Sequence, residues 1–153
     1  MTKGKYTAKE IADWFLSAID RSAGESLTHL KLQKLVYYAQ AWSLAMKDQP
    51  LFDEDVKAWT HGPVVESLFY AFRKYGWEAI PAPEKPPKID AATAKHLGEV
   101  LEVYGEFSAK HLERMTHNEA PWADARQGLP AEAGSNRIIS KSAMKTYYKK
   151  LLE

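Results

Sequence analysis

The stretch that follows Thr28 constrains the fold more than any other part of the chain, because its apolar side chains recur at the spacing of an α-helix. Threonine favours helix N-termini, so Thr28 marks the expected start. The apolar side chains that share one broad stripe are Leu32, Leu35, Val36, Ala39, Trp42 and Met46. This pattern predicts a long amphipathic helix, the clearest helix in the chain.

Further helices are predicted where a residue that favours helix N-termini precedes apolar side chains at helical spacing. The predicted starts are Thr7, Pro63, Asp90, Ser108 and Ser140. The predicted stops are the glycines Gly24, Gly76 and Gly105. Thr7 also has Glu10 three residues on, which is the capping-box pattern. With a turn or short helix at 120–122, the sequence predicts a mainly α fold of about six to seven helices.

The helical pattern loosens between residues 49 and 60. Apolar and polar residues alternate through Val56, Ala58 and Thr60, which is the period of a strand. We therefore expect a loop here with a short strand or hairpin near 55–60.

Two other stretches are predicted to be connectors. Residues 81–87 are rich in proline, which lacks the backbone donor that a helix needs, and residues 128–136 are small, polar and marked by proline and glycine. The chain length of 153 residues suits one domain that buries about two-thirds of the surface of its unfolded chain. We expect a single compact domain over residues 1–153.

The composition excludes several classes of protein. Hydrophobic residues make up 45% of the chain, which is too many for a disordered segment. The absence of cysteine excludes disulfides and cysteine-ligated zinc, and it fits a reducing compartment. The N-terminus lacks a signal-peptide pattern, and no run of 18 uncharged apolar residues occurs. We expect a soluble, cytoplasmic protein with no membrane partner.

Four short blocks of residues occur in a fixed order along the chain. They are residues 30–40 (LKLQKLVYYAQ), 50–52 (PLF), 58–64 (AWTHGPV) and 116–122 (THNEAPW). In sequence and order the blocks resemble the Panacea domain, the SocA-like antitoxin family of bacteria and their prophages, over about residues 11–125. The motif positions expected to be structural are Leu32, Leu35, Tyr37, Trp59, Gly62, Pro63, Val64, His117, Glu119, Pro121 and Trp122.

The resemblance implies a mainly helical antitoxin of a type II-like toxin–antitoxin system, which neutralises its cognate protein toxin by binding it. It implies that the toxin is encoded by an adjacent gene. It implies no known catalytic residues, and no cofactor is expected. The expected partner is therefore the toxin, and no enzymatic activity is expected.

The histidines do not have the spacing of a metal site. They are His29, His61, His96, His111 and His117. His111 and His117 are six residues apart, which places them on different faces of a continuous helix, and no His-Glu-x-x-His motif occurs. No metal site is predicted.

An acid–base site around His117 is a less favoured interpretation. His117, Asn118 and Glu119 bring an imidazole, an amide and a carboxylate together where a helix should end. The simpler interpretation is that His117 and Asn118 bond free carbonyls at the helix end while Trp122 packs on the core. A hydrolase centred on His61 and His117 remains the weaker alternative.

A partner surface is predicted on the long helix. Lys31, Lys34 and Tyr38 fall at i, i+3 and i+7, so they share a face that could receive an acidic partner. The alternative is a solvated face whose lysine stems cover apolar surface. Trp77 is a fourth candidate because it stands between a glycine and the proline-rich connector, whereas Trp42 and Trp59 are predicted to lie in the core.

The last helix offers a second alternative function. Four lysines and two tyrosines after Ser140 are typical of an aromatic and basic surface that binds nucleic acid. However, 21 lysines and arginines against 20 acidic residues leave a net charge of only +1, and no helix-turn-helix signature is present. A small nucleic-acid-binding regulator is therefore an alternative, and nucleic acid is not the expected partner.

Overall fold

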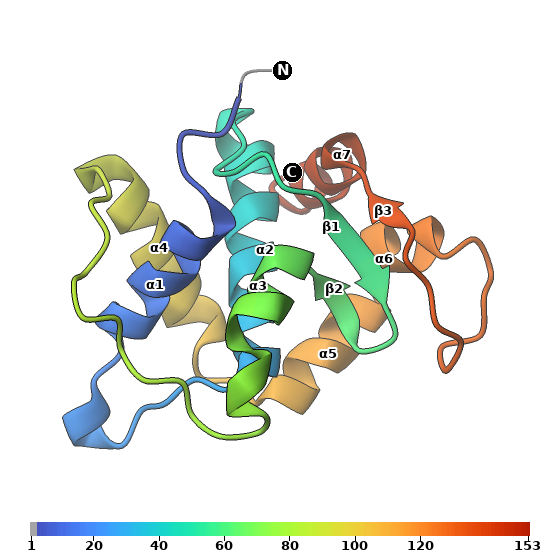
Figure 1. The fold of residues 1–153 in the computed structure, drawn as a ribbon. Helices are drawn as coiled ribbons and strands as arrows, with labels where there is room; N and C mark the ends of the chain where they lie inside the picture. Colours follow the sequence, from blue (N-terminus) through green and yellow to red (C-terminus); the bar gives the residue numbers. More distant parts are fainter. Residues whose placement is uncertain (1–2) are drawn as a thin grey trace.

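The long helix α2 (His29–Lys47) runs through the centre of the structure, and the remaining elements pack around it (Figure 1). The structure, a computed structural model, describes residues 3–153. Besides α2, the elements of that part of the chain are α1 (Ala8–Ala18), the 3-10 turn η1 (Arg21–Ala23), β1 (Val56–Trp59), β2 (Gly62–Val64), α3 (Glu66–Phe72), the 3-10 turn η2 (Arg73–Tyr75), α4 (Ala91–Tyr104), α5 (Ala109–His117), α6 (Ala120–Ala125), β3 (Ile138–Ile139) and α7 (Lys141–Leu151). The predicted mainly α fold of six to seven helices, with a hairpin near 55–60, is confirmed.

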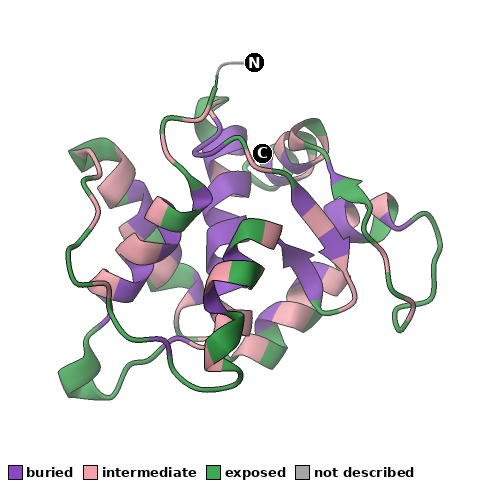
Figure 2. Cartoon of the chain, in the orientation of Figure 1, coloured by how far each residue is buried: buried purple, intermediate pink, exposed green. Residues whose placement is uncertain are grey.

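Helix α2 is buried around almost its whole circumference from Leu32 to Ala45 (Figure 2). The apolar stripe predicted from the sequence is therefore only part of its buried surface. Burial extends to polar side chains, namely Gln33, Lys34, Gln40 and Ser43. Polar groups at such depth need hydrogen-bond partners, because an unpaired buried group is costly.

Two buried glutamines show how α2 meets that need. The side chain of Gln33 bonds both the N–H and the C=O of Val65, at 2.9 and 3.0 Å. Gln40 accepts from the N–H of Leu51 at 2.7 Å and donates to the C=O of Phe52 at 2.9 Å. Each amide thus fastens a distant loop to the central helix with one donor and one acceptor.

Five predicted helix starts agree with the structure: Thr28 is the N-cap of α2 without a side-chain hydrogen bond, and four others have one. Side chains that accept a hydrogen bond from the backbone N–H three residues on belong to Thr7, Asp90, Ser108 and Ser140. At the first of these, Glu10 also bonds back to the cap residue and completes the capping box. Of the predicted glycine stops, Gly105 is the C-cap of α4, as expected. The other two are less direct, because α1 and α3 end earlier and Gly24 and Gly76 close the 3-10 turns that follow them.

The prediction that Pro63 opens a helix is wrong. Pro63 lies in β2, and α3 begins at Glu66 with Val65 as its N-cap. Gly62 has φ +104°, a conformation that lets the chain turn back between the two strands. Because β2 is at the edge of the sheet, the missing N–H of Pro63 is tolerated there.

The small sheet has the order β2-β1-β3, and both pairings are antiparallel. A buried arginine fastens the loop that leads into β3. The guanidinium of Arg126, which is 1% exposed, donates to the carbonyls of Ala58 at 2.9 Å and Pro130 at 2.8 Å. This contact holds the predicted loop over 128–136 against β1.

Within residues 3–153, no helix has the length and apolar character needed to cross a membrane.

Candidate functional site

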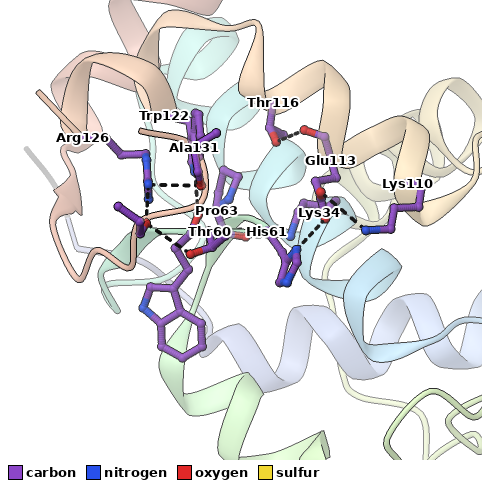
Figure 3. Close-up of polar contacts among 12 residues, drawn as sticks. Lys34, Thr60, His61, Pro63, Lys110, Glu113, Thr116, Trp122, Arg126 and Ala131 are labelled. Atoms are coloured by element: carbon purple, nitrogen blue, oxygen red, sulfur yellow. Dashed lines mark hydrogen bonds and ion pairs between the residues drawn. The ribbon is translucent and has the colours of Figure 1, made fainter. Parts of the chain in front are cut away.

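Three of the four sequence blocks, residues 30–40, 58–64 and 116–122, meet where α2, the β1–β2 hairpin and α5 come together (Figure 3). Lys34 stands at this junction, and its side chain is 0% exposed. Its Nζ donates to the carbonyl oxygen of Pro63 at 3.3 Å. A lysine with a single long hydrogen bond in the interior is costly to keep charged, because burial removes the water around the ammonium group.

The electrostatics of Lys34 follow from this burial. Desolvation lowers the pKa of Lys34 from 10.5 to about 7, and the nearby carboxylate of Glu113 acts in the opposite direction. A lysine with a pKa near neutrality has the property needed of a nucleophile or general base. However, no part of this side chain reaches the surface, so a substrate has no access to it in this structure.

The side chains of Lys34 and Thr116 pack closely against Gly62 at the same junction. A Cβ atom on Gly62 would lie 2.6 Å from Cε of Lys34 and 2.9 Å from Oγ1 of Thr116. Thr116 is itself held by a 2.7 Å bond from its hydroxyl to the carbonyl of Glu113. Glycine is therefore required at position 62 for two reasons: its φ is positive, and a side chain would occupy the space that Lys34 fills.

A second polar cluster is centred on Glu119, which is half-buried. Its Oε1 accepts hydrogen bonds from the hydroxyls of Tyr38 and Tyr148, each at 2.8 Å, and the hydroxyl of Tyr148 lies 3.0 Å from that of Tyr37. Burial raises the pKa of Glu119, and the two hydroxyl donors act in the opposite direction. Burial also raises the pKa of Tyr38, with Glu119 as the next cause. The cluster joins α2, the start of α6 and α7.

His117 and His61 occupy different environments. The ring of His117 stacks on Trp122 with centroids 3.9 Å apart, its Nε2 is buried without a hydrogen bond, and burial lowers its pKa. His61 is exposed, and its Nδ1 lies 3.2 Å from a carboxylate oxygen of Glu113 (Figure 3). No hydrogen bond joins the two histidines among the residues that the structure describes. At the helix end, Asn118 bonds the carbonyl of Arg114 as expected.

The predicted exposed face on α2 is wrong. Lys34 and Tyr38 are both 0% exposed, and Lys31 is half-buried with its Nζ bonded to the carbonyl of Gly105 at 2.5 Å. The helical spacing was right, but α5 and the hairpin cover Lys34, and Tyr104 of α4 stacks on Tyr38 at 4.0 Å.

The tryptophans agree with expectation only in part, because Trp77 is exposed as a partner-binding candidate must be, whereas Trp42 and Trp59 are less buried than predicted. Trp77 is 83% exposed, the most exposed of the large apolar side chains in the described part of the chain. Trp59 and Trp42 are half-buried, so neither lies fully in the core. The Nε1 of Trp59 donates to Asn136 at 3.0 Å, at the edge of a surface hollow.

The other motif positions lie inside. Those that are buried are Leu32, Leu35, Tyr37, Gly62, Pro63, Val64, Pro121 and Trp122, and those that are half-buried are Trp59, His117 and Glu119. Sequence reasoning missed the roles of Gln33 and Arg126. Gln33 carried a signal, a polar residue inside a matching block, whereas nothing local marked Arg126.

No group of three histidine, cysteine, aspartate or glutamate side chains in residues 3–153 could hold a metal ion. The motif residues instead build an interior framework that ties the central helix to the hairpin and to α5, α6 and α7. The fold and this framework define a mainly α-helical domain in which most of the motif residues point inward.

The model of one protein family, described as antitoxin SocA-like, Panacea domain, matches residues 32–123. The match covers more than half of the chain, and the chain belongs to this family. Comparisons with curated proteins and with solved structures returned no match.

Proposed function

We propose that this protein is the antitoxin of a toxin–antitoxin pair and that it neutralises its cognate protein toxin by direct binding. The observation that carries the proposal is the family match over residues 32–123. The inward direction of the motif residues supports a binding function. Lys34, which is fully buried, and Glu119, which is half-buried, make their hydrogen bonds to the protein's own backbone and tyrosines.

In this proposal the family motif acts as a scaffold and takes no part in a reaction. Neutralisation then depends on a surface that the scaffold presents to the toxin, through a buried apolar centre and a charged rim. Because binding is stoichiometric, the protection should end when the toxin outnumbers the antitoxin. The proposed toxin is the product of an adjacent gene, acting in the same cytoplasm.

The proposal is tested by co-expression with the product of the neighbouring gene. We expect growth to be rescued and a stable complex to be purified, with an interface that buries more than about 1,000 Å². Growth rescue without a detectable complex, or a neighbouring product that is not toxic, would contradict direct neutralisation.

The double variant His61→Ala/His117→Ala separates binding from catalysis. At matched expression, the folded variant should protect cells as the wild type does, since no acid–base group is needed for stoichiometric binding. The control is a titration of wild-type antitoxin against toxin, which should reach full protection near equal amounts. Protection by trace amounts of protein that is lost in the double variant would favour the hydrolase alternative.

A further inference from the structure

A hollow of about 350 Å³ lies beside the β1–β2 hairpin, between the start of α2 and the α3–η2 segment. We call it the Trp77 groove. The apolar residues that line it are Leu30, Trp59, Val64, Phe69 and Trp77. A mostly apolar, concave surface of this kind is the form in which proteins receive a side chain of a partner.

The aromatic walls of the Trp77 groove are fixed by other contacts. The ring of Trp59 meets Phe69 edge to face, with centroids 5.1 Å apart, and its Nε1 is bonded to Asn136. Phe69 is further packed against the ring of His29 at 5.5 Å. Walls that are already ordered lose little conformational freedom when a partner binds, which favours affinity.

The rim of the groove carries exposed aromatic residues. Trp77 is 83% exposed, and Tyr70 of α3, whose ring lies 5.5 Å from the ring of the lining residue Phe69, is 59% exposed. These are the two highest values among the large apolar side chains of residues 3–153. Tryptophan, tyrosine and arginine are the residue types that contribute most to binding at protein interfaces, and Arg73 lies with them, its guanidinium 5.3 Å from the Tyr70 ring centre.

The lining of the groove includes one permanently charged side chain, the guanidinium of Arg73, and no aspartate or glutamate. The carboxylate of Glu113 lies outside the lining, 3.2 Å from Nδ1 of the lining residue His61. Of the carboxylates close by in the chain, Glu66 is paired with a lysine at 3.4 Å, and Glu78 stands outside the lining. Arg73 makes no ion pair within the described residues, so its charge is available to a carboxylate of a partner.

We propose that the toxin docks at the Trp77 groove and that its docking segment carries an apolar or aromatic side chain flanked by carboxylates. The apolar side chain enters between Trp59, Phe69 and Trp77, and a flanking carboxylate pairs with Arg73. This assignment rests on the proposed antitoxin function, and it names the surface and the partner chemistry that the function leaves open.

The test measures the binding of purified toxin, the product of the neighbouring gene, to variants of the full-length protein. Trp77→Ala should raise Kd at least about 30-fold, as truncation of a central interface aromatic does. Arg73→Glu should slow association about tenfold at low salt and weaken its salt dependence, since a rim charge acts mainly on encounter. The matched controls are Leu151→Ala and Lys150→Glu on α7, which should change Kd less than about threefold.

All four variants replace exposed residues, and equal melting temperatures would show that each stays folded. Hydrogen exchange of the wild-type complex should show protection over residues 66–77. If the wild type binds the toxin and both groove variants bind equally well, the groove assignment is overturned while the proposed function stands. Weakening by Lys150→Glu alone would move the site to α7. If the wild type neither binds nor protects, the proposed function fails and the groove assignment fails with it.

Discussion

Replacing Lys34 with methionine should change how the free energy of unfolding depends on pH. Lys34 is fully buried, and burial lowers its pKa from 10.5 to about 7. Methionine has a similar length and no charge, so it can fill the same space beside Gly62 without the titration. The substitution therefore isolates the electrostatic effect of the buried ammonium group.

The magnitude follows from the two pKa values of Lys34. Between pH 7 and 10.5 the unfolded chain holds a proton on this lysine that the folded chain has released, so the free energy of unfolding rises with pH. The slope is about 1.4 kcal/mol per pH unit, and the whole shift corresponds to roughly 5 kcal/mol. The cost of burying the charge is thus present in full below pH 7 and relieved as the pH rises.

The assay is urea unfolding of wild type and Lys34→Met at intervals from pH 6 to 9.5. The free energy of the variant minus that of the wild type should be level near pH 6 and fall by about 3 kcal/mol between pH 7.5 and 9.5. Higher pH is avoided because burial raises the pKa of Tyr148, so tyrosines ionising in the unfolded chain above about pH 10 would lower stability.

The control is Lys47→Met, the same substitution at the exposed end of the same helix, which accounts for the loss of one lysine from the chain. Two parallel curves for wild type and Lys34→Met would refute the reasoning. They would mean that Lys34 keeps its proton in the folded protein, through water or a carboxylate that stabilises the charge.

Substitutions at two motif positions, Gly62 and Glu119, test the motif as a scaffold. Gly62→Ala should lower the free energy of unfolding by about 3 kcal/mol, because φ is +104° and the added Cβ would lie 2.6 Å from Cε of Lys34. The control is Gly134→Ala, where no atom lies within 4 Å of the added Cβ, and it should change the free energy of unfolding by less than about 0.5 kcal/mol. Equal melting curves for the two variants would contradict the steric argument. Glu119→Ala should cost about 2–4 kcal/mol in urea unfolding, since it leaves two tyrosine hydroxyls without their acceptor. Glu119→Gln should cost less, because it keeps an oxygen acceptor and avoids burying a charge; similar losses in both variants would show that the hydroxyls find other partners.

Local sequence signals predicted the framework of helices well. The caps at Thr7, Asp90, Ser108 and Ser140 depend only on a side chain and the N–H three residues on, so four residues contain the whole interaction. The prediction failed at Pro63, where the same residue type suits a helix start and an edge strand. There the pairing with β1 and the glutamine bonds to Val65, both from distant parts of the chain, decided the outcome.

The candidate site shows the same division. The sequence by itself determined the family motif, the mainly α fold and the open question posed by Trp77. Only the tertiary structure decided that Lys34 and Tyr38 are buried while Trp77 is exposed. The physical reason is that helical spacing tells which side chains share a face, whereas burial depends on which other elements cover that face. For α2 those elements are the hairpin, α4, α5 and α7, which come from sequence positions that no local pattern connects to it.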